Sequence, residues 1–216
     1  MPNIAKNLEK IRESIRQAET RAGRVQGSVQ LIAVTKGVTA NQILEAYNQG
    51  QRDFGESRLQ EAIPKIEILP KDIRWHFIGD LQSNKVKRIA DLFSVIHSLD
   101  RLSQIPPLQK IEGSIDALIE VNIGNEIQKS GISPDALDEF VESVLKCKHV
   151  RLRGLMTIGP VHQNPELARP YFQQLKKLAD RFGPDAWLSM GMSSDFEVAI
   201  QEGSTHVRVG SAIFKA

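Results

Sequence analysis

The stretch that decides the fold is Leu31-Ile32-Ala33-Val34-Thr35, followed at once by Lys36 and Gly37. A short apolar run rich in β-branched residues predicts a strand buried on both faces, as in a parallel sheet. Lys36 is then a lone amine at the carboxyl end of that strand. Because burial disfavours the charged ammonium, a buried lysine there would be a nucleophile for carbonyl groups. The alternative is a lysine that extends out of the strand end or pairs with a carboxylate across the core.

Similar strand-like runs recur along the rest of the chain. Their apolar centres lie near Leu31, Phe54, Phe77, Val95, Leu118, Leu152, Leu188 and Val207. Successive centres are 18 to 36 residues apart, which is too long for hairpins and suits strand–helix–strand crossovers. The pattern predicts an α/β fold in which residues 1–216 form one domain, a single (β/α)8 TIM-type barrel. A doubly wound open sheet is the alternative.

Helix signals agree with this arrangement. Thr39-Ala40-Asn41-Gln42 is a capping-box pattern, and Ser133-Pro134 and Asn164-Pro165 each place a capping residue before a proline. The first residues predict an added amino-terminal amphipathic helix that ends at Gly23. Its apolar face comprises Ile4, Leu8, Ile11, Ile15 and Ala18.

Composition narrows the function classes. The formal charge of +2 is small and both signs are interspersed, so nucleic acid is not an expected partner. No apolar stretch approaches membrane-spanning length and no signal-peptide core is present, so we expect a cytoplasmic protein with no membrane partner. One cysteine, Cys147, excludes an intrachain disulfide, and five histidines without ligand spacing predict no metal site. No long apolar stripe calls for a dimer, so a monomer is expected.

Functional groups of such barrels gather at the carboxyl ends of the strands, and phosphate sites follow strands seven and eight. Here these positions carry Met190-Gly191-Met192-Ser193-Ser194 and Arg208-Val209-Gly210-Ser211. Glycines allow close backbone approach and serines supply hydroxyl donors. Ser193 and Ser194 open an expected helix at residues 195–200, whose amino terminus would attract an anion. Ser194 also has a capping-box spacing with Glu197, which would explain it without a ligand.

Arg208 alternates with Val207 and Val209, which predicts that it points into the barrel. A surface ion pair is the alternative. A nucleophilic lysine opposite a phosphate site suits two chemistries. One is a lysine aldolase acting on a sugar phosphate. The other is pyridoxal 5′-phosphate bound to the lysine as a Schiff base, with an Asp or Arg at the ring nitrogen, and Arg208 favours this second chemistry.

An ordered set of motifs then resembles a known family, the pyridoxal-phosphate homeostasis proteins, over nearly the whole chain. The blocks are Ala33-Val34-Thr35-Lys36, Phe54-Gly55-Glu56, Trp75-His76-Phe77-Ile78-Gly79 with Leu81-Gln82 and Asn84-Lys85, Gly154-Leu155-Met156, Leu188-Ser189-Met190-Gly191-Met192-Ser193, and Arg208-Val209-Gly210 with Ala212-Ile213-Phe214.

The resemblance implies a barrel similar to the N-terminal domain of alanine racemase, with pyridoxal 5′-phosphate bound covalently to Lys36. By matched position, the phosphate would be held by Ser194, Gly210 and Ser211, with Ser193 beside them. Arg208 would face the pyridine nitrogen and keep it unprotonated. His76 and Met190 would lie near the ring, with core packing as the alternative for each.

Two departures from the family pattern are visible. Ser57 stands where the family usually has Asn, which would loosen the site if that amide helps to hold the cofactor. Lys215 follows Phe214 where the family usually has Gly.

The resemblance implies a role in intracellular cofactor homeostasis, delivery to cofactor-dependent apoenzymes, and amino-acid and keto-acid balance, without robust catalysis. A weak racemase-like enzyme and a lysine aldolase are the alternatives. Two-base racemisation needs a second acid/base group opposite Lys36, which is a tyrosine in alanine racemase. The only tyrosines, Tyr47 and Tyr171, fall in helix-like segments, so racemisation is the less favoured role.

Overall fold

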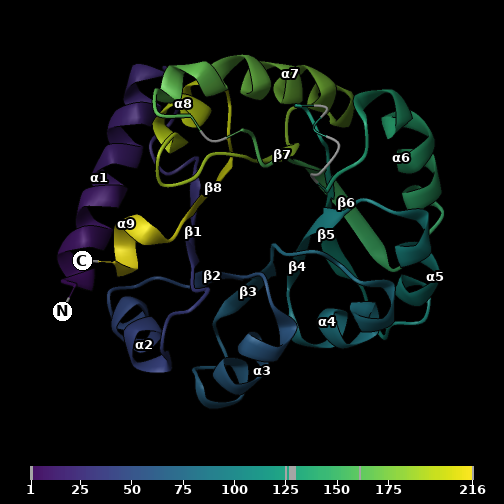
Figure 1. The fold of residues 1–216 in the computed structure, drawn as a ribbon, viewed down its shortest axis with the longest axis horizontal. Coiled ribbons are helices and arrows are strands. Elements are labelled where there is room, and N and C mark those ends of the chain that lie inside the picture. The colour runs from purple at the N-terminus through teal and green to yellow at the C-terminus, as the bar shows by residue number, and fades with distance from the viewer. Residues whose placement is uncertain (1, 125, 127–129, 161, 216) are drawn as a thin grey trace.

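The computed structural model describes residues 2–124, 126, 130–160 and 162–215. Within this part of the chain, eight parallel strands close into a barrel in sequential order, with helices around it (Figure 1). The strands are β1 (Gln30–Val34), β2 (Asp53–Glu56), β3 (Arg74–Phe77), β4 (Val95–Leu99), β5 (Ile115–Glu120), β6 (Val150–Met156), β7 (Trp187–Ser189) and β8 (His206–Val209). All eight expected strands are present, and the closed barrel excludes the open sheet.

Helices follow the strands and cover the outside of the barrel. They are α1 (Ile4–Arg21), α2 (Ala40–Asn48), α3 (Leu59–Ile68), α4 (Val86–Leu92), α5 (Ile105–Leu108), α6 (Leu137–Leu145), α7 (Arg169–Ala179), α8 (Phe196–Gln201) and α9 (Ser211–Phe214). Short 3-10 turns lie at Ser83–Lys85, Leu102–Gln104, Pro134–Ala136, Pro165–Ala168 and Asp180–Phe182. The expected capping box forms at α2, where Thr39 and Gln42 cap each other. No helix within the described residues is long and apolar enough to cross a bilayer.

Helix α1 closes the seam between the last strand and the first. Its buried face contains the five expected apolar residues and also Glu19, and it packs against α2, α8 and α9 (Figure 1). Near its start, the Asn7 side-chain amide donates a hydrogen bond to the carbonyl of Ile213, 3.0 Å away. The two ends of the described chain are therefore joined directly.

Two apolar regions lie on the two faces of the sheet. The larger one, between strands and helices, contains Val207 and Val209. A small inner group contains Val95, Leu118 and Met156, with Trp187 packed against it. Because successive residues of a strand point to opposite faces, the residues between the outer ones fill the barrel. In this barrel several of those interior positions are polar, and they form the deeper part of the site.

A bulge in β6 sets how β6 meets its neighbours. Leu152 pairs with Ala117 and Gly154 pairs with the next residue, Leu118, so β6 has one extra residue at this point. Gly154 has a φ of 151°, and a Cβ there would lie 2.1 Å from the carbonyl oxygen of Trp187 on β7. Only glycine therefore permits this approach of β6 to β7.

Candidate functional site

Lys36 lies in a turn just beyond β1. The N–H of Val38 donates to the carbonyl of Thr35 at 2.9 Å, and Gly37 has a φ of 69°, which favours glycine at the third position of such a turn. Thr35 takes the buried place at the strand end, whereas the Lys36 side chain is exposed. Of the two sequence interpretations, the buried lysine is therefore wrong, and the lysine that extends out of the strand end is the one observed. The strand ends at Val34, and the turn carries Lys36 out to the barrel mouth.

A buried ion pair fixes the backbone directly before Lys36. The Glu56 carboxylate at the end of β2 is fully buried and accepts from Lys65 Nζ on α3 at 2.6 Å and from Thr35 Oγ1 at 2.6 Å. Lys65 also donates to the Thr35 carbonyl at 2.9 Å. Glu56 belongs to the motif Phe54-Gly55-Glu56 but had no predicted role, and Lys65 was not singled out from sequence. Their contacts hold Thr35, and through it the turn that carries Lys36.

Lys36 faces a cleft of about 520 Å³ at the mouth of the barrel. Residues that follow β8, namely Gly210, Ser211 and Lys215, line the same cleft. Gly210 lies so close to β1 that a Cβ there would be 3.1 Å from the carbonyl oxygen of Val34. The structure thus brings together the amine and two of the residues expected to hold a phosphate.

Ser193 and Ser194 line a neighbouring cleft of about 540 Å³. The two clefts are joined by a hydroxyl contact, because Ser211 Oγ donates to Ser193 Oγ at 3.1 Å. Helix α8 begins one residue later than expected, with Asp195 as its N-cap, so the capping-box explanation of Ser194 is wrong. The Asp195 carboxylate instead accepts from the Met192 N–H at 2.6 Å.

Arg208 points into the barrel, as its alternation with valines predicts, and is 4% exposed. Its Nη1 donates to Ser189 Oγ at 2.6 Å and its Nη2 to the Thr157 carbonyl at 2.8 Å. Burial lowers the pKa of the guanidinium to about 10, although Glu120 and Asp195 oppose that shift. Arg208 remains a cation at neutral pH because that pKa lies well above 7.

His76 lies inside the barrel, fully buried. Its Nε2 is 2.8 Å from Asp53 Oδ1, and its Nδ1 is 2.9 Å from Nε2 of His97, which is also fully buried. His97 Nδ1 is in turn 2.9 Å from Ser189 Oγ. His76 is therefore connected to Arg208 through two residues, His97 and Ser189, that sequence reasoning did not single out.

Like His76 and Arg208, the expected site residues Met190 and Ser57 line neither cleft. Met190 is fully buried in the outer core, next in sequence to the inward-facing Ser189. Ser57 is half-buried after β2, and its carbonyl oxygen would be 2.0 Å from a Cβ on Gly79. Neither residue is among those that line the Lys36 cleft or the Ser193 cleft.

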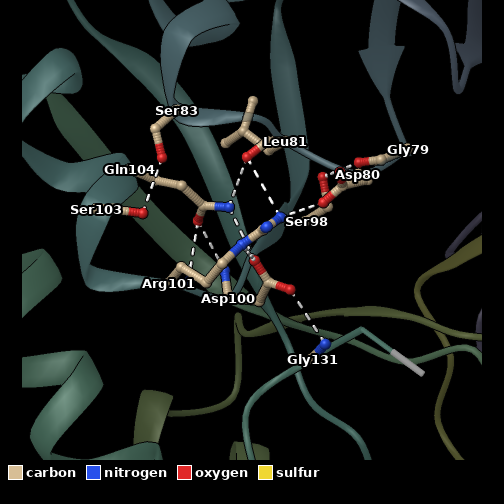
Figure 2. Close-up of polar contacts among 10 residues, drawn as sticks. All are labelled: Gly79, Asp80, Leu81, Ser83, Ser98, Asp100, Arg101, Ser103, Gln104 and Gly131. Carbon is tan, nitrogen blue, oxygen red and sulfur yellow. Dashed lines mark hydrogen bonds and ion pairs between the residues drawn. The ribbon is translucent and has the colours of Figure 1, made fainter. Parts of the chain in front are cut away.

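A further polar cluster ties together the loops after β3 and β4 (Figure 2). The Asp100 carboxylate accepts from Gln104 Nε2 at 2.8 Å and from the Gly131 N–H at 3.2 Å, and it pairs with Arg101 Nε at 2.9 Å. Arg101 also pairs with Asp80. This cluster stiffens the mouth of the barrel and places a carboxylate near the end of β5.

Glu120, the last residue of β5, is 6% exposed. Burial raises the pKa of its carboxyl to about 7, Asp100 acts in the same direction, and Arg208 opposes the shift. In the unfolded chain the same carboxyl titrates near 4.5. Between these values the folded protein holds a proton that the unfolded chain releases, so the contribution of Glu120 to stability falls as pH rises from about 4.5 to about 7.

We therefore expect Glu120→Gln to gain stability relative to the native chain as pH rises through that window. The measurement is the free energy of unfolding by urea for both proteins at several pH values from 4.5 to 7.5. Contributions from other titrating groups cancel in the difference between the two proteins. A difference that stays constant with pH would contradict the raised pKa of Glu120.

Comparisons with known proteins identify the family to which a chain of this sequence and fold belongs. A profile of the family described as "Alanine racemase, N-terminal domain" matches residues 6–216. The pyridoxal phosphate homeostasis protein of Aquifex aeolicus is 44% identical, covering 98% of this chain and 97% of that protein. PipY of Synechococcus elongatus, solved with PLP bound, is 34% identical with a TM-score of 0.81, covering 98% of this chain and 100% of that chain.

Alanine racemase of Corynebacterium glutamicum is 16% identical with a TM-score of 0.71, and the match covers 99% of this chain and 61% of the racemase. At that identity the likeness shows the fold alone. The closed eight-stranded barrel agrees with it, and the relatives of about 40% identity match over their full length. This chain therefore belongs to the family of pyridoxal phosphate homeostasis proteins.

Proposed function

We propose that this protein binds pyridoxal 5′-phosphate covalently at Lys36 and serves in intracellular homeostasis of that cofactor. The observation that carries the proposal is that Lys36, Gly210 and Ser211 line one cleft, with Ser193 bonded to Ser211. The homeostasis proteins of Aquifex aeolicus and Escherichia coli and the PLP-bound PipY structure support cofactor binding and a role in homeostasis.

The residues present fit this cofactor. An exposed lysine amine, neighbouring serine hydroxyls and a glycine packed tightly against Val34 suit an aldehyde and a phosphate. The cofactor would supply an aldehyde, and the Lys36 amine would condense with it to form a C=N bond, the aldehyde oxygen and the two amine hydrogens leaving as one water molecule. Ser193, Ser194, Gly210 and Ser211 would hold the phosphate.

The other expected residues have distinct parts in the proposal. Arg208 would present N–H donors to the pyridine nitrogen, and a permanent donor there favours an unprotonated nitrogen and a weaker electron sink. His76 would act on Arg208 from within the barrel, through His97 and Ser189. Met190 would shape the wall of the site from the outer core, and Ser57 would contribute a hydroxyl where an amide would reach further.

Holding the cofactor is favoured over turning over a substrate. Tyr47 lies on α2, where its hydroxyl donates to Asp72 Oδ1 at 2.7 Å, and Tyr171 lies on α7. Both are on the outer ring of helices, so neither is placed opposite Lys36 as the second base of a racemase. A cytoplasmic monomer that passes the cofactor to apoenzymes and affects amino-acid and keto-acid balance completes the proposal.

The test uses two lysines of the same cleft. Purified protein incubated with pyridoxal phosphate should show the visible absorbance of a Schiff base, and Lys36→Ala should abolish it. Lys215→Ala, which removes the other lysine of that cleft, should retain it. Borohydride reduction and peptide mass spectrometry should then place the adduct on Lys36. Absorbance that survives in Lys36→Ala would refute the attachment site, and a native protein that stays colourless would refute cofactor binding.

A further inference from the structure

A continuous line of hydrogen bonds crosses the interior of the barrel. It runs from Arg208 on β8 through Ser189 on β7, His97 on β4 and His76 on β3 to Asp53 on β2. The four contacts measure 2.6, 2.9, 2.9 and 2.8 Å in that order. Ser189 and both histidines are fully buried, so every link is made away from water.

The two ends of this line fix its direction. A guanidinium only donates and an ionised carboxylate only accepts, while a neutral imidazole has one N–H and one acceptor nitrogen. If His76 carried its proton on Nδ1, its bare Nε2 would face the Asp53 carboxylate without a proton between them. His76 Nε2 therefore donates to Asp53, and His76 Nδ1 is left as an acceptor.

The remaining links follow from that step. His97 Nε2 must donate to His76 Nδ1, so His97 Nδ1 accepts the Ser189 hydroxyl proton, and Ser189 Oγ accepts from Arg208. His76, His97 and Ser189 each contribute one proton, to the contacts with Asp53, His76 and His97 respectively. Arg208 contributes the proton of the fourth contact, to Ser189. Every group is satisfied with both histidines neutral, and in one direction only.

The surroundings favour neutral histidines. Burial is the largest influence on both rings and lowers the pKa of His76 and, further, that of His97. His97 faces His76, His206, Arg208 and Arg74, all of which disfavour a second proton. Around His76, Asp53 and Asp116 favour protonation and Arg74 opposes it.

We infer that Ser189 and His97 are positioning residues, which hold the Arg208 guanidinium in one orientation through a hydrogen-bond chain of fixed direction ending at Asp53. The Thr157 carbonyl holds the second Nη nitrogen at 2.8 Å, so both ends of the guanidinium fork are engaged. With both ends held, the plane of the guanidinium cannot turn when a ligand arrives. The step from Arg208 to the cofactor ring rests on the proposed function, whereas the chain itself does not.

The first arm of the test needs no cofactor. Nitrogen-15 NMR of histidine-labelled protein should show His76 and His97 as neutral Nε2–H tautomers from pH 6 to pH 8. The Arg208 guanidinium protons should exchange slowly with water and should exchange at least tenfold faster in Ser189→Ala. An Nδ1–H tautomer at His97, or unchanged Arg208 exchange in Ser189→Ala, would overturn the inference.

The second arm measures cofactor release. Because a hydrogen bond to a charged group is lost, Ser189→Ala should release pyridoxal phosphate about tenfold faster, and Ser189→Thr, which keeps the hydroxyl, should restore retention. Ser98→Ala is the matched control. Ser98 is a buried serine on β4 whose hydroxyl donates to the Gly79 carbonyl, and it takes no part in the hydrogen-bond chain from Arg208 to Asp53. Release that is equal in Ser189→Ala and Ser98→Ala would overturn the inference. Failure of the native protein to bind the cofactor would refute the proposed function. The NMR result alone would then test the hydrogen-bond chain.

Discussion

Replacing Lys65 by methionine is expected to lower the free energy of unfolding by about 3–5 kcal/mol. The Glu56 carboxylate has no exposed surface, and Lys65 Nζ lies 2.6 Å from its Oε1. Methionine keeps most of the volume of the lysine stem but removes the cation, so a buried charge would lose its counter-ion. Urea unfolding of the native and variant proteins measures the loss.

Two further variants separate charge from packing. Glu56→Gln combined with Lys65→Met removes both charges and should recover more than half of the loss, because no ion then remains buried. Lys87→Met, at an exposed position of α4, should change stability by no more than about 0.5 kcal/mol. A Lys65→Met loss as small as that of Lys87→Met would show that the ion pair contributes little.

Gly154→Ala is expected to destabilise the barrel by about 2–5 kcal/mol. At a φ of 151° a side chain is strained, and the new Cβ would lie 2.1 Å from the carbonyl oxygen and 2.8 Å from the amide nitrogen of Trp187. These are backbone atoms of β7, so the contact is relieved only if β6 and β7 move apart. Differential scanning calorimetry should show a clear fall in melting temperature.

Gly113→Ala is the control for backbone strain without a clash. Gly113 has a φ of 79°, and a Cβ there would meet nothing within 4 Å. Gly113→Ala should lower the free energy of unfolding by about 1 kcal/mol, the usual cost of a left-handed conformation for an L residue. Equal losses at Gly113 and Gly154 would mean that the contact with Trp187 does not limit the β6–β7 distance.

The fold could be predicted from sequence because each strand has a recognisable apolar pattern in its own short stretch of residues. Leu31 and Val207 mark apolar runs, and the spacing between such runs requires helical crossovers. The inward orientation of Arg208 could be predicted by the same local alternation. The choice between a buried and an exposed Lys36 could not be made from sequence, because it depends on the residue at which the strand ends. Thr35 bonds to Glu56 and occupies the buried place, and the turn at Gly37 then directs Lys36 outward.

The deeper part of the site was hidden for another reason. His97 meets Ser189, which lies 92 positions further along the chain, across the width of the barrel. His97 has no distinctive neighbourhood in sequence, and the block Leu188–Ser193 that contains Ser189 does not indicate a partner on β4. Closure of the sheet alone brings the two residues together. Glu56 and Lys65 are only nine positions apart, and a carboxylate at a strand end with a lysine on the next helix was a signal available from sequence.

The bond from Asn7 to Ile213 has a consequence for how this chain reaches its native state. It joins residues 206 positions apart, and the apolar face of α1 is covered partly by α8 and α9. During synthesis the part of that face covered by α8 and α9 therefore stays exposed to water until those two helices have left the ribosome. Because such distant contacts must form before the ring is complete, closure is expected to be a late and slow step, during which nascent chains depend on protection from aggregation.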